Sequence, residues 1–272
     1  MARGLSEIEL KSEWQALPRN WYDIYQWKGT SGADYLEWSA EWIFNDFSQI
    51  QLVTDGLRSE RFRVKDHRGQ ISLQTEVKQI TEKRLIRAMF NSRTFKMINS
   101  RNVEEEVTVF DYEVPLKDSY RAKHGDIDLL CKLPGTCLCV EAKNPKSNES
   151  ILKAVLQAYV YTSLISTKRK LFVNDYRLDP EVKLAPAVLT FASCTSGKQL
   201  EKLKEGSHLP KLVNKMDDKL AQIGVAPMRF LLVTTDGDEL ANCLTTTTEA
   251  NGDVKAVFRD DFKLKVKEKA LP

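Results

Sequence analysis

The chain has 272 residues, of which 42% are hydrophobic and 29% charged, and its formal net charge at pH 7 is +3. This composition is that of a folded globular protein, and no stretch reaches the roughly 20 apolar residues of a membrane-spanning helix. The first residues include acidic side chains where a signal peptide needs an apolar core, so we expect a cytoplasmic protein with no membrane partner.

The near balance of charges means that any contact with nucleic acid must depend on local clusters of basic residues. The five cysteines are odd in number and include no CxxC pair. This pattern disfavours both a disulfide framework and a zinc site, so we expect reduced, partly buried thiols. The sequence also has no GxSxG or HExxH motif, and a serine hydrolase or zinc peptidase therefore has no support.

The N-terminal end, residues 1–60, is unusually aromatic, because all five tryptophans lie within the first 42 positions. Tyr35, Trp38 and Trp42 follow one another at steps of three and four, the spacing of one helix face. Such a face could stack on nucleic-acid bases or bind a partner protein. Aromatic residues at this spacing are more often core, and we expect them to pack inside the protein.

Residues 61–240 are typical of one mixed domain. In chain order we expect a turn at 66–69 between two short strands, a helix at about 75–91, a strand at about 105–114, and strands at 126–131 and 137–142. A helix capped by Ser147 or Asn148 should then run to about 165. Strands at 187–192, with Pro186 at the strand's edge, and at 230–234 complete the domain. This order predicts an α/β fold with a mixed central sheet flanked by helices.

The remaining residues, 241–272, are predicted to be a C-terminal tail. The last ten residues are rich in lysine and are expected to be solvated.

Two short strands carry the residues that point to a chemistry. Side chains alternate along a strand, so Glu141 and Lys143 should share one face, and Asp126 and Asp128 should share a face of the preceding strand. If the chain turns about Pro134 and Gly135, Asp128 lies directly opposite Glu141. The same turn would place Asp126 opposite Lys143, which makes Asp126 the weaker candidate. A type II Pro-Gly turn is not the preferred hairpin turn, but a longer symmetric loop would keep the pairing.

Directly opposed residues have Cβ atoms about 5 Å apart, and two carboxylates that close repel each other unless a positive charge lies between them. Hard oxygen ligands that leave room for water suit Mg²⁺ or Mn²⁺. Such an ion can polarise a phosphodiester, and the ammonium group of Lys143 can position water or stabilise developing charge. Asp128, Glu141 and Lys143 therefore predict a metal-dependent phosphodiesterase.

This pattern resembles a known family. Gly125-x-x-Asp128 followed by Glu141-x-Lys143 is similar to the signature of the PD-(D/E)XK nuclease superfamily, in the variant that lacks proline before the aspartate. Gln157-x-x-x-Tyr161 resembles the helix motif of its RecB-like branch. The resemblance covers residues 75–195 and leaves out the aromatic N-terminus.

The resemblance implies a restriction-endonuclease-like αβββαβ core and a nuclease that cleaves DNA rather than RNA. Asp128 and Glu141 would bind the metal, and Lys143, Gln157 and Tyr161 would complete the catalytic set. A further metal ligand is expected from the preceding helix, where Glu82 is preferred and Glu76 is the runner-up. The family's usual setting is restriction, repair or anti-phage defence, often beside a helicase.

Three basic side chains near the motifs are candidates for binding substrate, namely Lys123, His124 and Lys153. A histidine in a basic loop is more often simply solvated, so His124 is the least specific of the three. The alternative to a nuclease is a catalytically inactive module of the same fold that binds nucleic acid or a partner protein, using the aromatic N-terminus.

Overall fold

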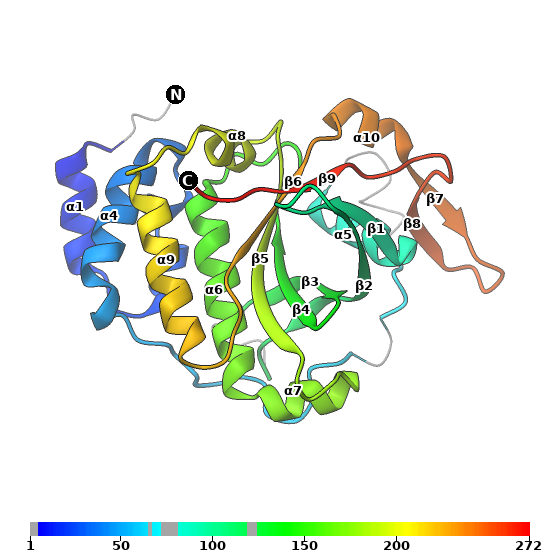
Figure 1. Ribbon diagram of the computed structural model, residues 1–272, viewed down its shortest axis with the longest axis horizontal. Coiled ribbons are helices and arrows are strands. Elements are labelled where there is room, and N and C mark those ends of the chain that lie inside the picture. The colour runs from blue at the N-terminus through cyan, green and yellow to red at the C-terminus, as the bar shows by residue number, and fades with distance from the viewer. Residues whose placement is uncertain (1–4, 65–66, 72–80, 119–123) are drawn as a thin grey trace.

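The computed structural model describes residues 5–64, 67–71, 81–118 and 124–272. A mixed sheet lies at the centre, with helices packed on its faces (Figure 1). Short helices form the N-terminal part: α1 (Glu7–Ala16), α2 (Trp21–Gln26), α3 (Lys28–Ser31), the 3-10 turn η1 (Ala33–Tyr35), α4 (Leu36–Asp46) and the 3-10 turn η2 (Phe47–Gln49).

The sheet and its covering helices follow. They comprise α5 (Glu82–Ser92), β1 (Thr94–Ile98), β2 (Glu104–Pro115), β3 (Asp126–Leu133), β4 (Thr136–Ala142), α6 (Ile151–Thr167), α7 (Arg169–Tyr176), β5 (Lys183–Phe191), α8 (Thr195–Lys202), α9 (His208–Ala221) and β6 (Arg229–Val233). The C-terminal part contains α10 (Gly237–Cys243), β7 (Leu244–Thr248), β8 (Val254–Phe258) and β9 (Val266–Glu268).

The central sheet is mixed, as predicted, and it closes on itself. Strands β1 to β4 pair in antiparallel order, β5 is parallel to β4, and β6 is parallel to β5. Strand β9 lies between β6 and β1 and joins the two edges into a seven-stranded barrel. The expected core of one helix, three strands, a helix and a strand therefore accounts for only part of the sheet.

The C-terminal segment is not the solvated tail that its lysines indicated. β9 belongs to the central sheet, and β7 and β8 form a separate hairpin whose second strand packs against α5. In Figure 1 the red C-terminal strand runs across the molecule beside β6. Val266 is buried between both neighbouring strands, whereas Lys265 and Lys267 point to solvent. This alternation, short as it is, is that of a half-buried strand.

Several predicted boundaries shift in the structure. Helix α5 begins at Glu82 because Thr81 is extended and its side chain accepts the Arg84 amide hydrogen. Helix α6 is capped by Ser150 and not by Ser147 or Asn148. The turn predicted at 66–69 falls partly outside the described residues, as do the first turns of the predicted 75–91 helix and Glu76.

Several strands of the predicted domain differ from the prediction. Residues 61–64 and 67–69 form no strand, so the two short strands expected around the 66–69 turn are not found in these described residues. β1 was not expected, because only Phe95 and Met97 of its five residues face inward. β5 begins four residues earlier than expected, so Pro186 lies inside the strand and not at its start. Pairing with β6 starts at the next residue, Ala187, and Pro186 thus stands at the end of that ladder.

The hydrophobic core has two main parts, one on each face of the β3–β4 pair. Leu130 and Cys139 face α6, while Leu129 and Val140 face α5. All five cysteines are buried free thiols, in line with the sequence prediction.

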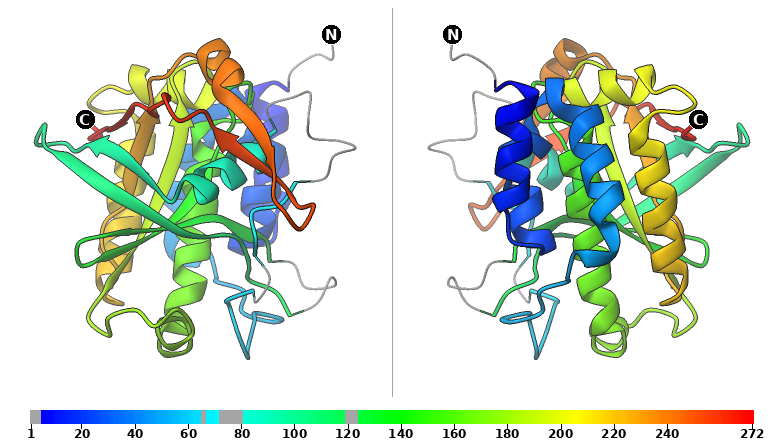
Figure 2. Two further views of the ribbon diagram at one scale, coloured as in Figure 1. Left: turned by 90° about the vertical axis from the view of Figure 1, so that its right-hand side faces the viewer. Right: turned by 90° about the vertical axis from the view of Figure 1, so that its left-hand side faces the viewer.

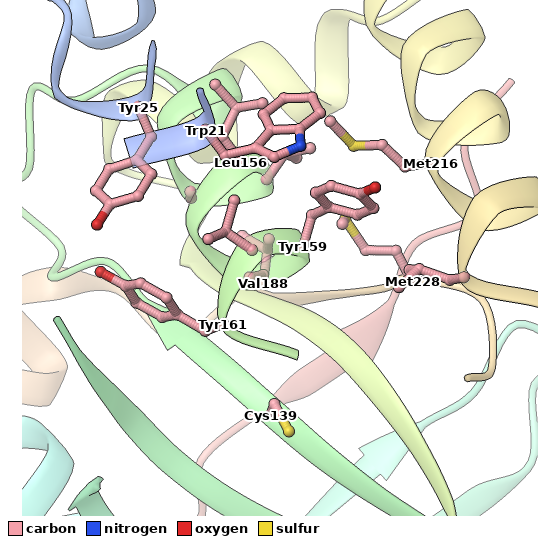
Figure 3. Close-up of a cluster of buried hydrophobic side chains, with 14 of the residues drawn as sticks. Trp21, Tyr25, Cys139, Leu156, Tyr159, Tyr161, Val188, Met216 and Met228 are labelled. Carbon is pink, nitrogen blue, oxygen red and sulfur yellow. The ribbon is translucent and has the colours of Figure 1, made fainter. Parts of the chain in front are cut away.

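The aromatic N-terminus packs into the α6 side of the core, where Trp21 makes an edge contact with Tyr159 (Figure 3). Trp42 is 8% exposed and belongs to the same cluster, and Trp38 and Tyr35 pack against it. The expectation that these aromatic residues are core is confirmed.

Candidate active site

The β3–β4 hairpin has the predicted register. Its pairs run from Leu133 opposite Thr136 to Leu129 opposite Val140, about a two-residue turn at Pro134 and Gly135. Gly135 has a φ of 68°, a backbone conformation that glycine adopts without strain and that a type II turn requires at this position. The Pro-Gly sequence therefore forms the tight turn directly, without a longer loop.

The next step of this register brings Asp128 beside Glu141. The Asp128 carboxylate accepts a hydrogen bond of 2.7 Å from the backbone amide of Ala142. Asp128 and Glu141 both line a pocket of about 310 Å³. The two carboxylates therefore line the same pocket.

The pocket is strongly acidic, and we call it the acidic pocket. Its lining contains the carboxylates Glu82, Glu113, Asp126, Asp128, Glu141 and Glu149, the lysines Lys83, Lys143 and Lys153, and Ile86, Gln157 and Tyr161. Six carboxylates face three ammonium groups, so negative charge is in excess.

Lys143 lies at the centre of this pocket and is 3% exposed. Its ammonium nitrogen is 2.9 Å from a Glu141 carboxylate oxygen and 2.9 Å from a Glu149 oxygen. It also donates a longer hydrogen bond of 3.3 Å to the side-chain oxygen of Gln157. Burial opposes its charge, but Glu141 and Glu149 together raise the pKa of Lys143 above its usual value. Lys143 is therefore a fixed positive charge at neutral pH.

The carboxylates behave in the opposite way. Burial raises the pKa of Asp128 well above its ordinary value, and the neighbouring Glu141 and Glu82 raise it further. Burial also raises the pKa of Glu141, although Lys143 opposes this rise, and it raises the pKa of Glu82. Burial removes water from these three carboxylates, and too little positive charge lies nearby to stabilise their ionised forms. A cation at their centre would relieve that cost.

Among the described residues, no group of three or more Asp, Glu, His or Cys side chains is arranged as a ready-made metal cage. The donor set nevertheless fits Mg²⁺ or Mn²⁺, because these ions prefer carboxylate oxygens and commonly take only one or two from the protein, with water and substrate phosphate as the other ligands. Asp128 and Glu141 supply such a pair. Glu82 starts α5 and lines the same pocket, near enough to influence Asp128 electrostatically.

Helix α6 brings Gln157 and Tyr161 to the pocket, one turn apart. The Gln157 amide donates to the Tyr161 hydroxyl at 3.3 Å, while its carbonyl oxygen accepts from Lys143. Gly125 has a specific reason to be glycine, since a Cβ atom there would lie 2.2 Å from the Tyr161 hydroxyl oxygen. The glycine of the first motif and the tyrosine of the last thus fit against each other.

The aromatic N-terminus also reaches this site, which the sequence analysis did not foresee. Tyr25 of α2 meets Tyr161 edge-on, with ring centres 5.9 Å apart, and the two hydroxyl groups interact (Figure 3). Tyr25 is 1% exposed. It therefore packs against Tyr161 inside the core.

Glu149 is another residue of the pocket that the sequence analysis missed. It stands just before α6 and contacts both Lys143 and Lys153. The four-residue spacing between Glu149 and Lys153 was a visible signal of that ion pair, but the contact with Lys143 depends on how the loop folds back.

The three candidate substrate-binding residues have different locations. Lys153 lines the acidic pocket, while Lys123 lies outside the described residues. His124 is 4% exposed and hydrogen-bonds through Nε2 to the Asp55 carbonyl oxygen at 3.0 Å. The expectation of a solvated histidine is wrong, and His124 does not line the acidic pocket.

Comparisons with protein-family models, with curated proteins and with solved structures found no match to this chain. In the part of the chain that the structure describes, no helix has both the length and the apolar character needed to cross a membrane. The assignment of a function therefore depends on the geometry of the site.

Proposed function

We propose that this chain is a nuclease that hydrolyses DNA phosphodiester bonds with Mg²⁺ or Mn²⁺, and that it is a member of the PD-(D/E)XK superfamily, close to its RecB-like branch. One observation carries the proposal. Asp128, Glu141 and Lys143 converge in one pocket with Gln157 and Tyr161. Asp128 lies on β3, Glu141 lies on β4 and Lys143 directly follows β4, whereas Gln157 and Tyr161 lie on helix α6.

The order of elements supports the same family. With β1 and α7 set aside, helix α5, the antiparallel strands β2, β3 and β4, helix α6 and strand β5 have the order of an αβββαβ core. β5 is parallel to β4, so this part of the sheet is mixed. In this interpretation β1, β6 and β9 are additions that close the sheet around the core.

Asp128 and Glu141 would hold the metal ion, and Glu82 is the candidate for an additional ligand or for a hydrogen bond to its water. When bound, the ion supplies a Lewis acid for the phosphate and makes a nearby water molecule more acidic. The excess of carboxylates in the acidic pocket supports a site for a cation there.

The side chains of the protein have distinct tasks in this proposal. Lys143 keeps its proton and can donate hydrogen bonds to the attacking water and to phosphate oxygens, where it stabilises the charge that develops in the transition state. Gln157 limits the direction of the Lys143 side chain through its carbonyl oxygen. Tyr161 in turn holds the Gln157 amide. Fixed geometry of this kind lowers the cost of reaching the transition state.

By the same resemblance, we propose restriction, repair or anti-phage defence as the biological setting. A helicase or another protein of such a system would be a partner.

The test is cleavage of linear, circular and single-stranded DNA by the purified chain, with Mg²⁺, Mn²⁺ or EDTA. We expect cutting with either metal and none with EDTA. The double variant Glu141→Gln with Lys143→Met should lose this activity. As a matched control, Lys204→Met with Glu205→Gln makes the same chemical changes at two exposed residues outside the acidic pocket.

Thermal denaturation of both double variants checks that they remain folded. Undiminished cutting by the Glu141 and Lys143 variant would refute the assignment of the site. A wild-type chain that binds DNA but does not cut it under any of these conditions would instead be a catalytically inactive binding module.

A further inference from the structure

A second hollow, of about 580 Å³, lies near the acidic pocket, and we call it the basic hollow. It is lined by Arg58, Arg61 and Lys117 together with Glu60 and Asp118. Residues at or just beyond one end of the β2–β3 strand pair line both hollows.

The proximity of the two hollows follows from the strand register. Pro115 of β2 pairs with Asp126 of β3, which lines the acidic pocket, and Lys117 follows two residues later. Arg58 lies at the same strand end, because its backbone amide donates to the carbonyl oxygen of Leu116. The two hollows therefore lie at neighbouring positions along the β2–β3 pair.

Among the described residues, no ion pair within 4.0 Å involves Arg58, Arg61 or Lys117. The Asp118 carboxylate is occupied, because it accepts hydrogen bonds from the backbone and hydroxyl groups of Ser59. Arg58, Arg61 and Lys117 thus offer positive charge to a ligand from outside.

The segment that carries the two arginines is firmly anchored. His124 holds the Asp55 carbonyl oxygen, and Leu57 is buried and forms an isolated β-bridge with Lys117. The Arg58 amide donates to the Leu116 carbonyl oxygen at 2.9 Å, and Phe62 is fully buried. The basic groups are therefore presented on ordered backbone, which lowers the entropic cost of binding. This anchoring also gives His124 a structural role.

A polyanionic substrate meets opposite charges in the two hollows. The acidic pocket alone repels a phosphodiester chain except where a metal ion holds one phosphate. Between Glu113 in the acidic pocket and Lys117, four residues of chain span about 13 Å, which corresponds to roughly four steps of the 3.4 Å axial rise of B-DNA.

We infer that the basic hollow binds the phosphate backbone of a DNA strand several nucleotides from the phosphate that is cut in the acidic pocket. This inference rests on the proposed nuclease function and defines its substrate more closely. The substrate is an extended polynucleotide, and a mononucleotide or a short diester would leave the basic hollow empty.

The first test is equilibrium binding of a fluorescent DNA oligonucleotide at several salt concentrations, with Ca²⁺ in place of Mg²⁺ to limit cleavage. In the triple variant Arg58→Ala, Arg61→Ala, Lys117→Ala, binding should weaken, and the slope of log affinity against log salt should decrease by about 2 to 3. A control triple variant, Lys11→Ala, Lys204→Ala, Lys211→Ala, removes the same charge from exposed sites outside both hollows and should keep the wild-type slope. An unchanged slope in the first variant would overturn the inference.

The second test separates this inference from the nuclease assignment. Bis(p-nitrophenyl) phosphate is a diester too small to reach from the acidic pocket to the basic hollow. The Arg58, Arg61 and Lys117 variant should lose far more kcat/KM on the oligonucleotide than on this small diester, and equal losses on both would count against the basic hollow. A wild-type chain that cleaves neither substrate with Mg²⁺ would contradict the nuclease assignment, while the salt slopes would still report on the hollow.

Discussion

Gly125 lies so close to Tyr161 that even the methyl group of an alanine would clash with the Tyr161 hydroxyl. The Tyr161 side chain is 4% exposed, its hydroxyl group accepts a hydrogen bond from Gln157, and Tyr25 packs edge-on against its ring. It therefore has little room to move away from an added Cβ. The glycine of the sequence motif is explained by this contact and not by an unusual backbone angle, since Gly125 is not among the residues with positive φ.

Replacement of Gly125 by alanine should displace Tyr161 and loosen Gln157, which contacts Lys143. Overpacking of this kind typically costs about 1–3 kcal/mol of stability, and we expect cleavage activity to fall as well. Urea denaturation and a cleavage assay measure the two effects. Gly237→Ala is the matched control, because its Cβ would lie 3.5 Å from the Pro145 side chain, an ordinary contact. Equal behaviour of the two variants would show that the contact with Tyr161 does not matter.

Glu149 contributes to the site through Lys143. In the structure the ammonium group of Lys143 lies 2.9 Å from a carboxylate oxygen of Glu141 and 2.9 Å from one of Glu149. A metal ion that binds Glu141 must compete with Lys143 for its carboxylate. Glu149 eases that competition, because it keeps a counter-charge on Lys143 when Glu141 turns to the metal.

We predict that Glu149→Gln raises the Mg²⁺ concentration needed for half-maximal cleavage by about three- to tenfold, or roughly 0.7–1.4 kcal/mol. Glu149→Asp should restore part of the wild-type value, since it keeps the charge. Glu201→Gln, at an exposed position of α8, serves as the control. A merely structural role for Glu149 would lower the melting temperature without changing the Mg²⁺ requirement, and that result would contradict the prediction.

At the scale of elements, local patterns were enough to predict the β3–β4 hairpin and its register. Alternating side chains and the Pro134-Gly135 turn both act between near neighbours in sequence, so the sequence alone identifies them. The first residue of α5 was harder to predict, because Thr81 is one of several residues in this region that are able to cap a helix. Closure of the sheet by β9 could not be inferred, since its partners β1 and β6 are far away in sequence and it has only three residues.

Strand β9 can be tested by a change at its buried centre. Val266 pairs with Met97 on one side and with Val233 on the other, and it is 2% exposed. Val266→Pro removes an amide hydrogen and leaves a gap, so we expect a loss of about 2–4 kcal/mol in the free energy of unfolding. Lys267→Ala, an exposed change in the same strand, should cost little. A urea midpoint for Val266→Pro equal to that of Lys267→Ala would argue against a role for β9 in closing the sheet.

At the scale of the whole molecule, charge is separated in a way that the net value of +3 conceals. The acidic pocket and the basic hollow lie at the same end of the β2–β3 pair, although Arg58 and Arg61 are distant in sequence from Asp128 and Glu141. Motif spacing identified Asp128 and Glu141 because both lie on one hairpin. The basic hollow depends on a loop that returns from the N-terminal region, and no periodic pattern indicates that return.

The acidic pocket should also make stability depend on pH. Burial raises the folded-state pKa values of Asp128, Glu141 and Glu82, so between about pH 4 and these raised values the folded chain binds more protons than the unfolded chain. These groups therefore lower the free energy of unfolding progressively as the pH rises through that window. A bound metal ion would neutralise the ionised carboxylates and should restore the lost free energy of unfolding.

Thermal denaturation with and without Mg²⁺ tests this linkage. Mg²⁺ at 100 times its dissociation constant adds about 2.7 kcal/mol to the free energy of unfolding. The increase in melting temperature should be larger at about pH 8 than at about pH 5, because protons compete with the ion for the carboxylates. Asp217, whose pKa burial raises to about 6, adds a pH dependence of its own. Comparison with the double variant Asp128→Asn, Glu141→Gln removes this background, since that variant keeps Asp217 but should not respond to Mg²⁺. An equal Mg²⁺ effect in both proteins would place the ion elsewhere.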